Sequence, residues 1–353
     1  MMDKIKVGIS IGDLNGIGPE LIIKTLEHQG ILKSCIPVIY ASAKVISYHR
    51  NVAKSEFFSF KSVNDAHNLI ENQVNLINCW QENVTINLGM ITSDGGKYAH
   101  ISLDRAVQDL KAGLIDALVT SPINKKAMNM ANFPHKGHTD YLGSEFSDHT
   151  PLMLMVSEDL RVAVLSHHIP LKDVAQQVTR ESISRTLEIL QKALIQDFDI
   201  EKPVIAVLGL NPHASDEGVI GDEEELIIRP AIIEAKKNGI LVSGPYPPDG
   251  FWGSGKWNKF DAILCMYHDQ GLIPFKMHSF GHGVNVTVGL PFVRTSPDHG
   301  TAYDIVGTNT ANESSFRTAL HLAIDMALNR KEYVEMRKNK LEKIAKPSEE
   351  VVE

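Results

Sequence analysis

The chain has 353 residues, of which 43% are hydrophobic and 22% are charged, and its formal net charge at pH 7 is -8. This composition excludes a disordered or fibrous protein, and the acidic balance argues against a nucleic-acid or anionic-membrane partner. Its three cysteines form no CxxC pair, which predicts a reducing compartment, the cytoplasm, rather than a disulfide framework. We expect no signal peptide and no membrane span.

Strands and helices are predicted to alternate along the chain, which is typical of an α/β fold with mainly parallel sheets. The first elements are strands at 6–11 and 35–42 and helices at 20–30 and 43–54. The segment 53–92 is richer in Asn and Phe, and we expect an inserted antiparallel piece there. Later elements are helices at 102–113 and 181–198 and strands near 115–120, 161–166, 203–208 and 261–267. Residues 346–353 are expected to be a frayed tail.

The turn after the first strand, GDLNGIGPE, contains Gly12, Gly16 and Gly18, which permit tight backbone turning. Pro19 suits the first turn of the next helix. The spacing is not the GxGxxG of a dinucleotide fingerprint, and no acidic residue ends an obvious second strand. We interpret this segment as a structural turn that shapes a cleft, with direct phosphate contact as the alternative.

Three histidines stand where buried strands give way to polar loops: His168, His213 and His268. Ligands of α/β sheets bind beyond the carboxyl ends of the strands. Three imidazoles placed there are predicted to meet around one divalent metal, with positions left open for a substrate oxygen. The alternative is that each histidine has only a local structural role and forms hydrogen bonds within its own loop.

A second group of residues suits an anionic ligand. His138 and Thr139 are adjacent polar donors in a glycine-flanked loop, and Lys276, Asn285 and Arg294 follow the His268 loop at intervals of nine residues. Lysine binds anions as a point charge, and arginine binds them through two parallel hydrogen bonds of its planar guanidinium group. We therefore predict that these residues bind a phosphate or carboxylate group. The alternative is that each of them is a solvated surface residue.

At these residues the chain resembles the 4-hydroxythreonine-4-phosphate dehydrogenase family of vitamin B6 biosynthesis. The resemblance covers nearly the whole length, through GISIGDLNGIGPE, DALVTSPINKKA, GHTDYLG, LNPHASDEGVIGDEE, GPYPPDGFW, MYHDQGLIPFK and VNVTVGLPFVRTSPDHGTAYDIVG. It implies oxidation of 4-phosphohydroxy-L-threonine with NAD or NADP to 2-amino-3-oxo-4-phosphooxybutanoate. This product decarboxylates to 3-amino-2-oxopropyl phosphate on the route to pyridoxal 5'-phosphate.

The resemblance also implies the architecture of the isocitrate and isopropylmalate dehydrogenases, two α/β lobes around a cleft. Residues 1–345 would form one catalytic region, in which the N- and C-terminal parts share one lobe and roughly 125–295 forms most of the other. The family works as a homodimer with its active site at the subunit interface. A monomer would then be incomplete.

By motif, the resemblance makes His168, His213 and His268 the ligands of zinc, magnesium or cobalt. The adjacent His167 is the ambiguity, and His168 is preferred because it directly precedes the IPL that follows the family's ligand. The implied substrate-binding residues are His138, Thr139, Lys276, Asn285 and Arg294. One departure lies in the turn, where Leu14 and Asn15 replace the family's usual Pro-Ala, which leaves only the stiffness of the turn in question.

The implied chemistry is metal-assisted oxidation of a hydroxyl group, with hydride transfer to the nicotinamide. Asp249 and Asp269 are candidates for the group that takes the hydroxyl proton, and each could instead orient a ligand histidine. For Asp269 we prefer the orienting role. The nicotinamide site is not located by sequence, although NPHASDEG and GPYPPDGFW are candidate backbone cradles.

Three alternatives stay open. The nearest is a sister dehydrogenase of erythronate or threonate 4-phosphate, which share the phosphate, hydroxyl and carboxylate but lack the amine. A metal-dependent hydrolase on the same histidines is more remote, because the chain has no HExxH motif. A non-catalytic metal- or phosphate-binding protein is the third.

Overall fold

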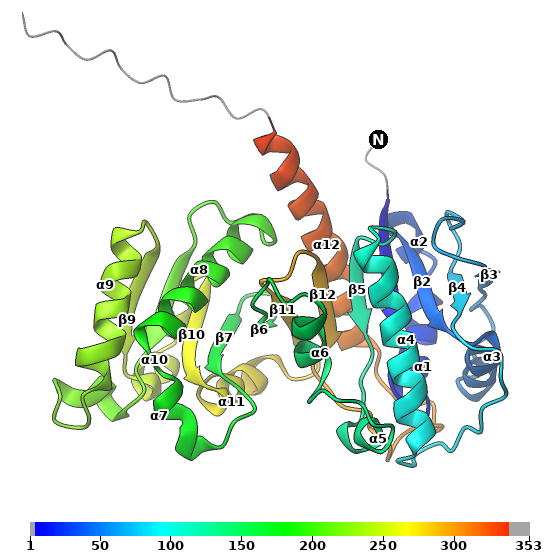
Figure 1. The fold of residues 1–353 in the computed structure, drawn as a ribbon, viewed down its shortest axis with the longest axis horizontal. Helices are drawn as coiled ribbons and strands as arrows, with labels where there is room; N and C mark the ends of the chain where they lie inside the picture. The colour runs from blue at the N-terminus through cyan, green and yellow to red at the C-terminus, as the bar shows by residue number, and fades with distance from the viewer. Residues whose placement is uncertain (1–3, 339–353) are drawn as a thin grey trace, which may run out of the picture.

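The computed structural model describes residues 4–338. They form one twelve-stranded sheet with helices on its faces (Figure 1). The strands are β1 (Ile5–Ser10), β2 (Cys35–Ala41), β3 (Lys61–Val63), β4 (Asn75–Asn78), β5 (Ala117–Thr120), β6 (Leu152–Val156), β7 (Arg161–Ser166), β8 (Val204–Leu208), β9 (Leu241–Tyr246), β10 (Ala262–Tyr267), β11 (Val284–Val288) and β12 (Val293–Pro297). Their order across the sheet is β3-β4-β2-β1-β5-β12-β11-β6-β7-β10-β8-β9.

The α-helices are α1 (Gly18–Leu26), α2 (Ile31–Ser34), α3 (Ala43–Val52), α4 (Ser93–Lys111), α5 (Lys125–Met130), α6 (His138–Glu145), α7 (Val174–Gln177), α8 (Arg180–Gln196), α9 (Arg229–Lys237), α10 (Pro248–Gly253), α11 (His268–Ser279) and α12 (Ser314–Arg337). Shorter helical turns occur at Leu171–Asp173, Pro212–Asp216, Glu224–Ile228 and Lys256–Lys259. The alternation expected from the sequence is confirmed.

The sheet has two parallel halves that meet at an antiparallel centre. Strands β3, β4, β2, β1, β5 and β12 pair in parallel, and so do β7, β10, β8 and β9. Between them, β12 with β11, β11 with β6, and β6 with β7 are antiparallel. In Figure 1 the two halves lie on either side of this centre. Because every parallel strand needs a crossover, each half carries its own helices.

The helix expected at 102–113 begins earlier, as α4 at Ser93. Its first residues, SDGGK, carry two glycines, which disfavour a helix by propensity. The side chain of Thr92 caps the helix by accepting a hydrogen bond from the Gly95 amide. A Cβ on Gly96 would lie 2.1 Å from the carbonyl oxygen of Ala127, so this glycine permits close packing of α4 on α5.

The expectation of an antiparallel insertion within 53–92 is wrong. Strand β3 pairs with β4 in parallel, and β4 pairs with β2 in parallel. Asn64, Asn68 and Asn72 belong to the crossover between β3 and β4. Asn75 holds that crossover, since its side chain accepts from the Ile70 amide at 2.8 Å and donates to the Ile70 carbonyl at 3.0 Å.

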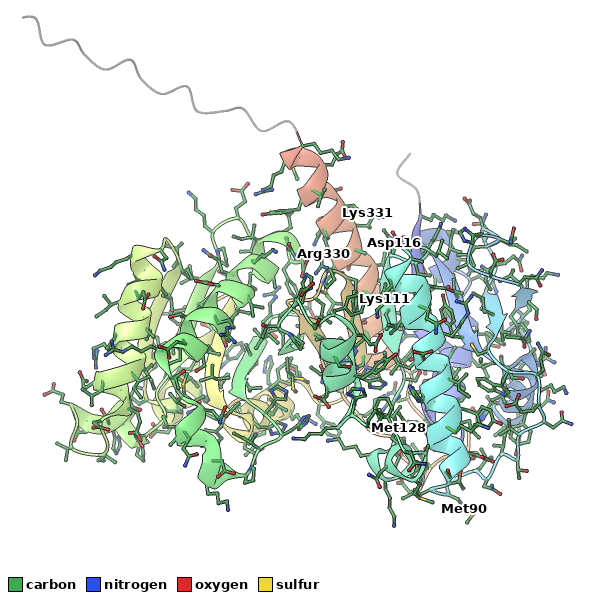
Figure 2. All side chains as sticks on the ribbon, viewed as in Figure 1. Met90, Lys111, Asp116, Met128, Arg330 and Lys331 are labelled. Atoms are coloured by element: carbon green, nitrogen blue, oxygen red, sulfur yellow. The ribbon has the colours of Figure 1, made fainter. Side chains whose placement is uncertain are left out.

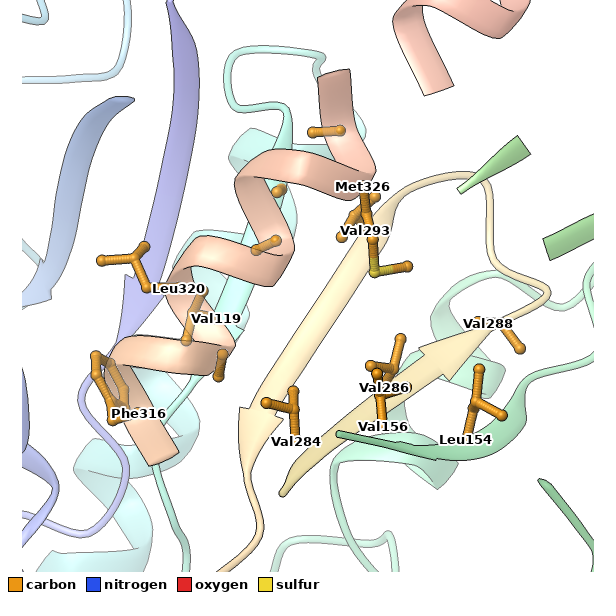
Figure 3. Close-up of a cluster of buried hydrophobic side chains, with 14 of the residues drawn as sticks. Val119, Leu154, Val156, Val284, Val286, Val288, Val293, Phe316, Leu320 and Met326 are labelled. Atoms are coloured by element: carbon orange, nitrogen blue, oxygen red, sulfur yellow. The ribbon is translucent and has the colours of Figure 1, made fainter. Parts of the chain in front are cut away.

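The C-terminal helix α12 packs across the centre of the sheet. Figure 3 shows Phe316, Leu320 and Met326 of this helix beside valines of β5, β11 and β12. At the far end of the helix, Lys331 pairs with Asp116 before β5 at 2.8 Å (Figure 2). The helix therefore ties the N-terminal strands to the central antiparallel ones.

No helix in the described part of the chain is long and apolar enough to cross a membrane. The expected tail, 346–353, lies outside the described residues. The lobe boundaries near 125 and 295 stay a prediction, because the sheet runs through both regions without a break.

Candidate functional site

A cavity of about 750 Å³ lies at the carboxyl ends of β5, β12 and β7. Ligands of α/β folds bind at this edge of the sheet, and the volume suits a small metabolite. Five of the residues expected from the sequence line it: His138, Thr139, His168, Asn285 and Arg294. The other five, which do not line it, are His213, His268, Lys276, Asp249 and Asp269.

The wall formed by β11 and β12 presents a polar face. Asn285 lies opposite Ser296 and Thr287 opposite Arg294 in the antiparallel register. Because side chains alternate along a strand, these four project from one face of the pair. We call them the β11/β12 face. The sequences of β11 and β12 do not show that these four side chains share a face. Their common orientation depends on the pairing register of the two strands, which only the structure reveals.

Arg294 is the buried cation of this face, with 3% of its surface exposed. Its guanidinium donates to the hydroxyl of Thr120 at 2.6 Å and to that of Thr287 at 3.0 Å. Burial lowers its pKa to about 10. Among the ion pairs of residues 4–338, none joins Arg294 to a carboxylate. A buried positive charge with neutral partners alone is a strong site for an anion.

Helix α6 begins at the opposite wall with His138 and Thr139. Burial and the positive charge of Arg294 hold the pKa of His138 well below its usual value. The imidazole is therefore neutral at pH 7 and can donate one hydrogen bond without adding charge. Lys125 and Lys136 also line the cavity. The surroundings of Arg294 are thus rich in donors.

The cavity lining contains polar atoms that lack partners. Four buried atoms without a hydrogen bond belong to lining residues: Ser121 Oγ, His138 Nε2, Asn285 Oδ1 and His299 Nε2. Unpaired buried polar groups cost free energy unless a ligand or water satisfies them. Their concentration in one cavity is what a site for a polar ligand requires.

The three predicted metal ligands follow neighbouring strands. His168 comes after β7, His268 after β10 and His213 after β8, and β10 lies between the other two strands. We call these residues the histidine rim. The ring centroids of His168 and His268 are 6.3 Å apart. Within residues 4–338 of one chain, however, no three histidine, cysteine or acidic side chains lie close enough to hold a metal ion.

The backbone at the rim is unusual. His168 has φ +54°, and the five residues from His213 to Glu217 all have positive φ. Non-glycine residues rarely adopt this conformation, and runs of it are associated with functional sites. Both histidines are exposed. Partial burial of the ring and, after it, nearby positive charge lower the pKa of His168 to about 4, so its ring is neutral and able to bind a cation.

Asp269 contacts the ring of His268, with Oδ1 2.6 Å from Nδ1. Such a contact fixes the tautomer that leaves Nε2 as an electron-pair donor. Asp249 is exposed on α10, beyond β9. Lys276 lies on α11 and pairs with Asp298 at 3.2 Å. Asp298 neighbours the lining residue His299, so Lys276 reaches the cavity wall through this carboxylate.

The N-terminal turn does not line the cavity but supports it. A Cβ on Gly12 would lie 2.3 Å from the carbonyl oxygen of Pro122, and Gly12 has φ +68°. Asp13 is buried and accepts a hydrogen bond from the Tyr303 hydroxyl at 2.5 Å. Burial raises the pKa of both groups. The turn therefore fixes the segment that follows β5 and the loop just after His299.

Sequence reasoning missed several polar lining residues, among them Ser121, Lys125, Lys136 and His299. Ser121 directly follows β5, and His299 comes two residues after β12. Both stand at carboxyl ends of strands, which is the signal that selected the three histidines. Lys125 begins α5 and Lys136 lies in the loop before α6, and neither carries a comparable signal.

Comparison with known proteins now places the chain. The family model of pyridoxal phosphate biosynthetic protein PdxA matches residues 33–323. The chain belongs to this family. A 4-hydroxythreonine-4-phosphate dehydrogenase of Bacteroides thetaiotaomicron is 45% identical over 342 residues, 97% of this chain and 94% of that relative. The crystal structure of a PdxA-family relative, the 4-hydroxythreonine-4-phosphate dehydrogenase of Klebsiella pneumoniae, has a TM-score of 0.78 and 31% identity, covering 92% of this chain and 98% of that one.

The fold expected for the PdxA family is confirmed. Isocitrate dehydrogenase of Methylococcus capsulatus has a TM-score of 0.50 and 11% identity, over 94% of this chain and 88% of that chain. At such identity the likeness concerns the fold alone. It agrees with an α/β architecture in which a cleft lies between the two halves of the sheet.

Proposed function

We propose that the protein oxidises 4-phosphohydroxy-L-threonine with NAD or NADP to 2-amino-3-oxo-4-phosphooxybutanoate. This product loses carbon dioxide to give 3-amino-2-oxopropyl phosphate, in the biosynthesis of pyridoxal 5'-phosphate. Family membership supports the reaction class. The assignment of an anionic substrate rests mainly on the buried Arg294. Its only hydrogen-bond partners among the described residues are threonine hydroxyls. A doubly anionic substrate supplies the missing negative charge.

The side chains of the cavity bind and orient this substrate. Arg294, His138 and Thr139 offer donors to anionic oxygens, and Asn285 fixes the chain of the substrate between them. Lys276 adds positive charge near this wall of the cavity, where it pairs with Asp298. The reacting carbon loses hydride to the nicotinamide while its hydroxyl loses a proton, and cleavage of the carboxylate bond then releases carbon dioxide. Asp249 and Asp269 remain the candidates for the proton acceptor.

We further propose His168, His213 and His268 as ligands of a divalent ion, zinc, magnesium or cobalt. Neighbouring strand ends and three imidazole side chains support this donor set, although one chain does not bring three ligands together within its described residues. Such an ion would lower the pKa of the substrate hydroxyl and stabilise its ionised form. The Asp269 contact supports an orienting role for that carboxylate.

A second copy of the chain is proposed to complete the site, as a homodimer. Helix α11 starts at His268 and exposes Ile273 (57%) and Met277 (83%), and Phe280 directly after its last residue is 82% exposed. We call these three residues the apolar stripe of α11, and a cluster of exposed apolar side chains of this kind marks an association surface. A partner bound there would lie beside the histidine rim.

The nicotinamide site is proposed beyond the carboxyl ends of β8 and β9. The two candidate cradles follow these adjacent parallel strands, as the turn Pro212–Asp216 and as helix α10. The location in the cytoplasm stays a prediction from the cysteine content and the biosynthetic relatives.

The deciding experiment is formation of reduced nicotinamide by the purified protein with 4-phosphohydroxy-L-threonine, NAD or NADP and a divalent metal. Erythronate and threonate 4-phosphates are run in parallel. We expect turnover with the aminated substrate. Turnover with a sugar acid instead would assign the sister activity, and no turnover with any of the three would refute a dehydrogenase of this substrate class.

A further inference from the structure

The backbone ladder between β8 and β10 stops before the two strands reach the histidine rim. Its last paired residues are Val207 of β8 and Leu264 of β10. If the same register continued, Gly209 would lie opposite Met266, with Gly209 one residue beyond β8 and Met266 still within β10. The hydrogen bonds at this next position decide how far apart the ends of the two strands lie.

The side-chain amide of Gln270 bridges the two strands at this position. Its Oε1 accepts a hydrogen bond from the Met266 amide at 2.7 Å, and its Nε2 donates to the Gly209 carbonyl at 2.7 Å. A primary amide offers an acceptor and a donor, as a peptide group does. Gln270 is 7% exposed, so both hydrogen bonds are shielded from water. The amide therefore replaces a backbone rung and sets the spacing of the strand ends.

On the β10 side, this spacing acts directly on the backbone of His268. His268 follows β10 as the first residue of α11, two residues after Met266 and two before Gln270. The indole Nε1 of Trp252, on α10, donates to the Gln270 carbonyl at 3.2 Å. The backbone is thus held on both sides of His268.

On the β8 side, a buried carboxylate extends the fixed backbone toward His213. Glu224 has 0% of its surface exposed, and its Oε1 accepts from the Leu210 and Asn211 amides, both at 2.7 Å. The amide of Ala214 in turn donates to the Asn211 carbonyl at 3.1 Å. The segment between the bridge and His213 is therefore tied down along its length, so the spacing at the bridge determines where this loop begins.

We propose that Gln270 is a positioning residue of the histidine rim, which sets the distance between the loops that carry His213 and His268. The inference rests on the proposed metal ligands and goes beyond them, because the Gln270 amide binds the backbone and not a ligand. The rim has donor chemistry that fits a divalent ion, since Asp269 contacts Nδ1 of His268 and leaves Nε2 as an electron-pair donor.

The test measures zinc binding rather than turnover. Metal is removed by chelation, and the dissociation constant for zinc chloride is measured by competition with a chelating dye for the wild type, Gln270→Met and Gln270→Glu. Methionine has a similar length but neither hydrogen-bonding atom, whereas glutamate keeps the acceptor for Met266 and at pH 7 has no donor for the Gly209 carbonyl. Gln191→Met, the same change at a half-buried glutamine of α8, is the matched control.

We expect both Gln270 variants to bind zinc about 10- to 100-fold more weakly than the wild type, the usual loss when a residue that orients metal ligands is replaced. Gln191→Met should bind zinc as the wild type does. The absorption bands of the cobalt-loaded Gln270 variants should also shift, because they depend on the arrangement of the ligands. Wild-type zinc affinity in Gln270→Met would overturn the positioning role.

A second control separates position from stability. Asn75→Ala removes a buried side chain that holds the crossover between β3 and β4, near the far edge of the sheet. It should lower the free energy of unfolding and leave zinc affinity and the cobalt spectrum unchanged. If Asn75→Ala weakened zinc binding as much as Gln270→Met at equal stability, the loss would report on stability alone and the inference would be wrong.

These outcomes are separable from failure of the proposed function. His213→Ala is measured alongside, with His282→Ala at an exposed histidine outside the rim as its control. If His213→Ala loses zinc binding and Gln270→Met does not, the proposed ligands stand and the positioning role falls. If His213→Ala binds zinc like the wild type, the proposed ligand set is wrong and the positioning role falls with it. If Gln270→Met weakens zinc binding but the wild type forms no reduced nicotinamide, the positioning role stands and the dehydrogenase activity does not.

Discussion

The cavity and the histidine rim lie at the same edge of the sheet but are built differently. In the cavity, Arg294 is buried, its hydrogen bonds to Thr120 and Thr287 are made within one chain, and the surrounding strands fix its register. In the rim, His168 and His213 are exposed and His268 is half-buried, and the three histidines do not meet within the described residues of one chain. On the proposals above, one chain supplies the residues for the anionic groups, whereas a metal at the rim would need a ligand from outside the described residues of one chain.

Removing one histidine of the rim should have the largest effect. For His213→Ala we expect zinc affinity and turnover to fall by at least about 100-fold, because even residues that only support metal ligands contribute about 10- to 100-fold. Metal titration and steady-state rates measure this, with His282→Ala as control. Wild-type metal content and rate would remove His213 from the site.

Removing the buried cation of the cavity should affect substrate binding but not metal binding at the histidine rim. Arg294→Ala is expected to raise the KM for the substrate about 10- to 100-fold, through loss of charge-assisted hydrogen bonds worth about 1.5–3 kcal/mol. Zinc affinity should not change. Arg317→Ala, which alters a half-buried surface ion pair with Glu313, is the control. An unchanged KM would show that the anionic groups bind elsewhere.

The N-terminal turn, which supports the cavity, allows a test of how much its hydrogen bonds stabilise the fold. Asn15 is buried, donates to Thr92 Oγ1 at 2.8 Å and accepts from the Asn87 amide at 2.8 Å. Asn15→Ala should lower the free energy of unfolding by about 2 kcal/mol, because the Asn87 amide loses this acceptor and Thr92 loses a buried donor. Urea denaturation measures this against the exposed Asn51→Ala. A loss as small as that of the control would show that the turn does not depend on these bonds.

The smallest effect is expected from the acid sensitivity of a buried scaffold histidine. Burial lowers the pKa of His49 from 6.5 to about 4, and its Nε2 donates to the Leu14 carbonyl at 2.9 Å. Between these pH values the unfolded chain binds the proton and the folded one does not, so stability falls as pH decreases through this window. We expect His49 to contribute a loss of about 1 kcal/mol between about pH 7 and about pH 5.5. An identical pH dependence of unfolding in His49→Gln would contradict this.

The sequence predicted the regular part of the fold because hydrophobic periodicity and strand ends are local signals. It placed β1, β2 and α3 within a few residues and selected His138, Asn285 and Arg294 for the cavity they line. It failed where structure depends on contacts distant in the chain. The glycines that start α4 are explained only by α5, and the parallel pairing of β3 depends on a crossover held by Asn75.

The site was less predictable than the fold for the same reason. His299 carries the same strand-end signal as His213, but only the three-dimensional lining distinguishes which of them faces the cavity. The unpaired state of its Nε2 depends on the Gly300 carbonyl and on burial, neither of which is a property of sequence spacing.

The most direct test of the contrast between cavity and rim is to disrupt the proposed homodimer and to measure which ligands the single chain still binds. Met277→Asp with Phe280→Asp places charges on the apolar stripe of α11 and should prevent association. Zinc and substrate binding are then measured by calorimetry on this double variant, with its mass in solution determined by light scattering. We predict a monomer that binds the phosphorylated substrate but loses tight zinc binding. A monomer that binds zinc as tightly as the wild type would contradict a rim completed by a second copy.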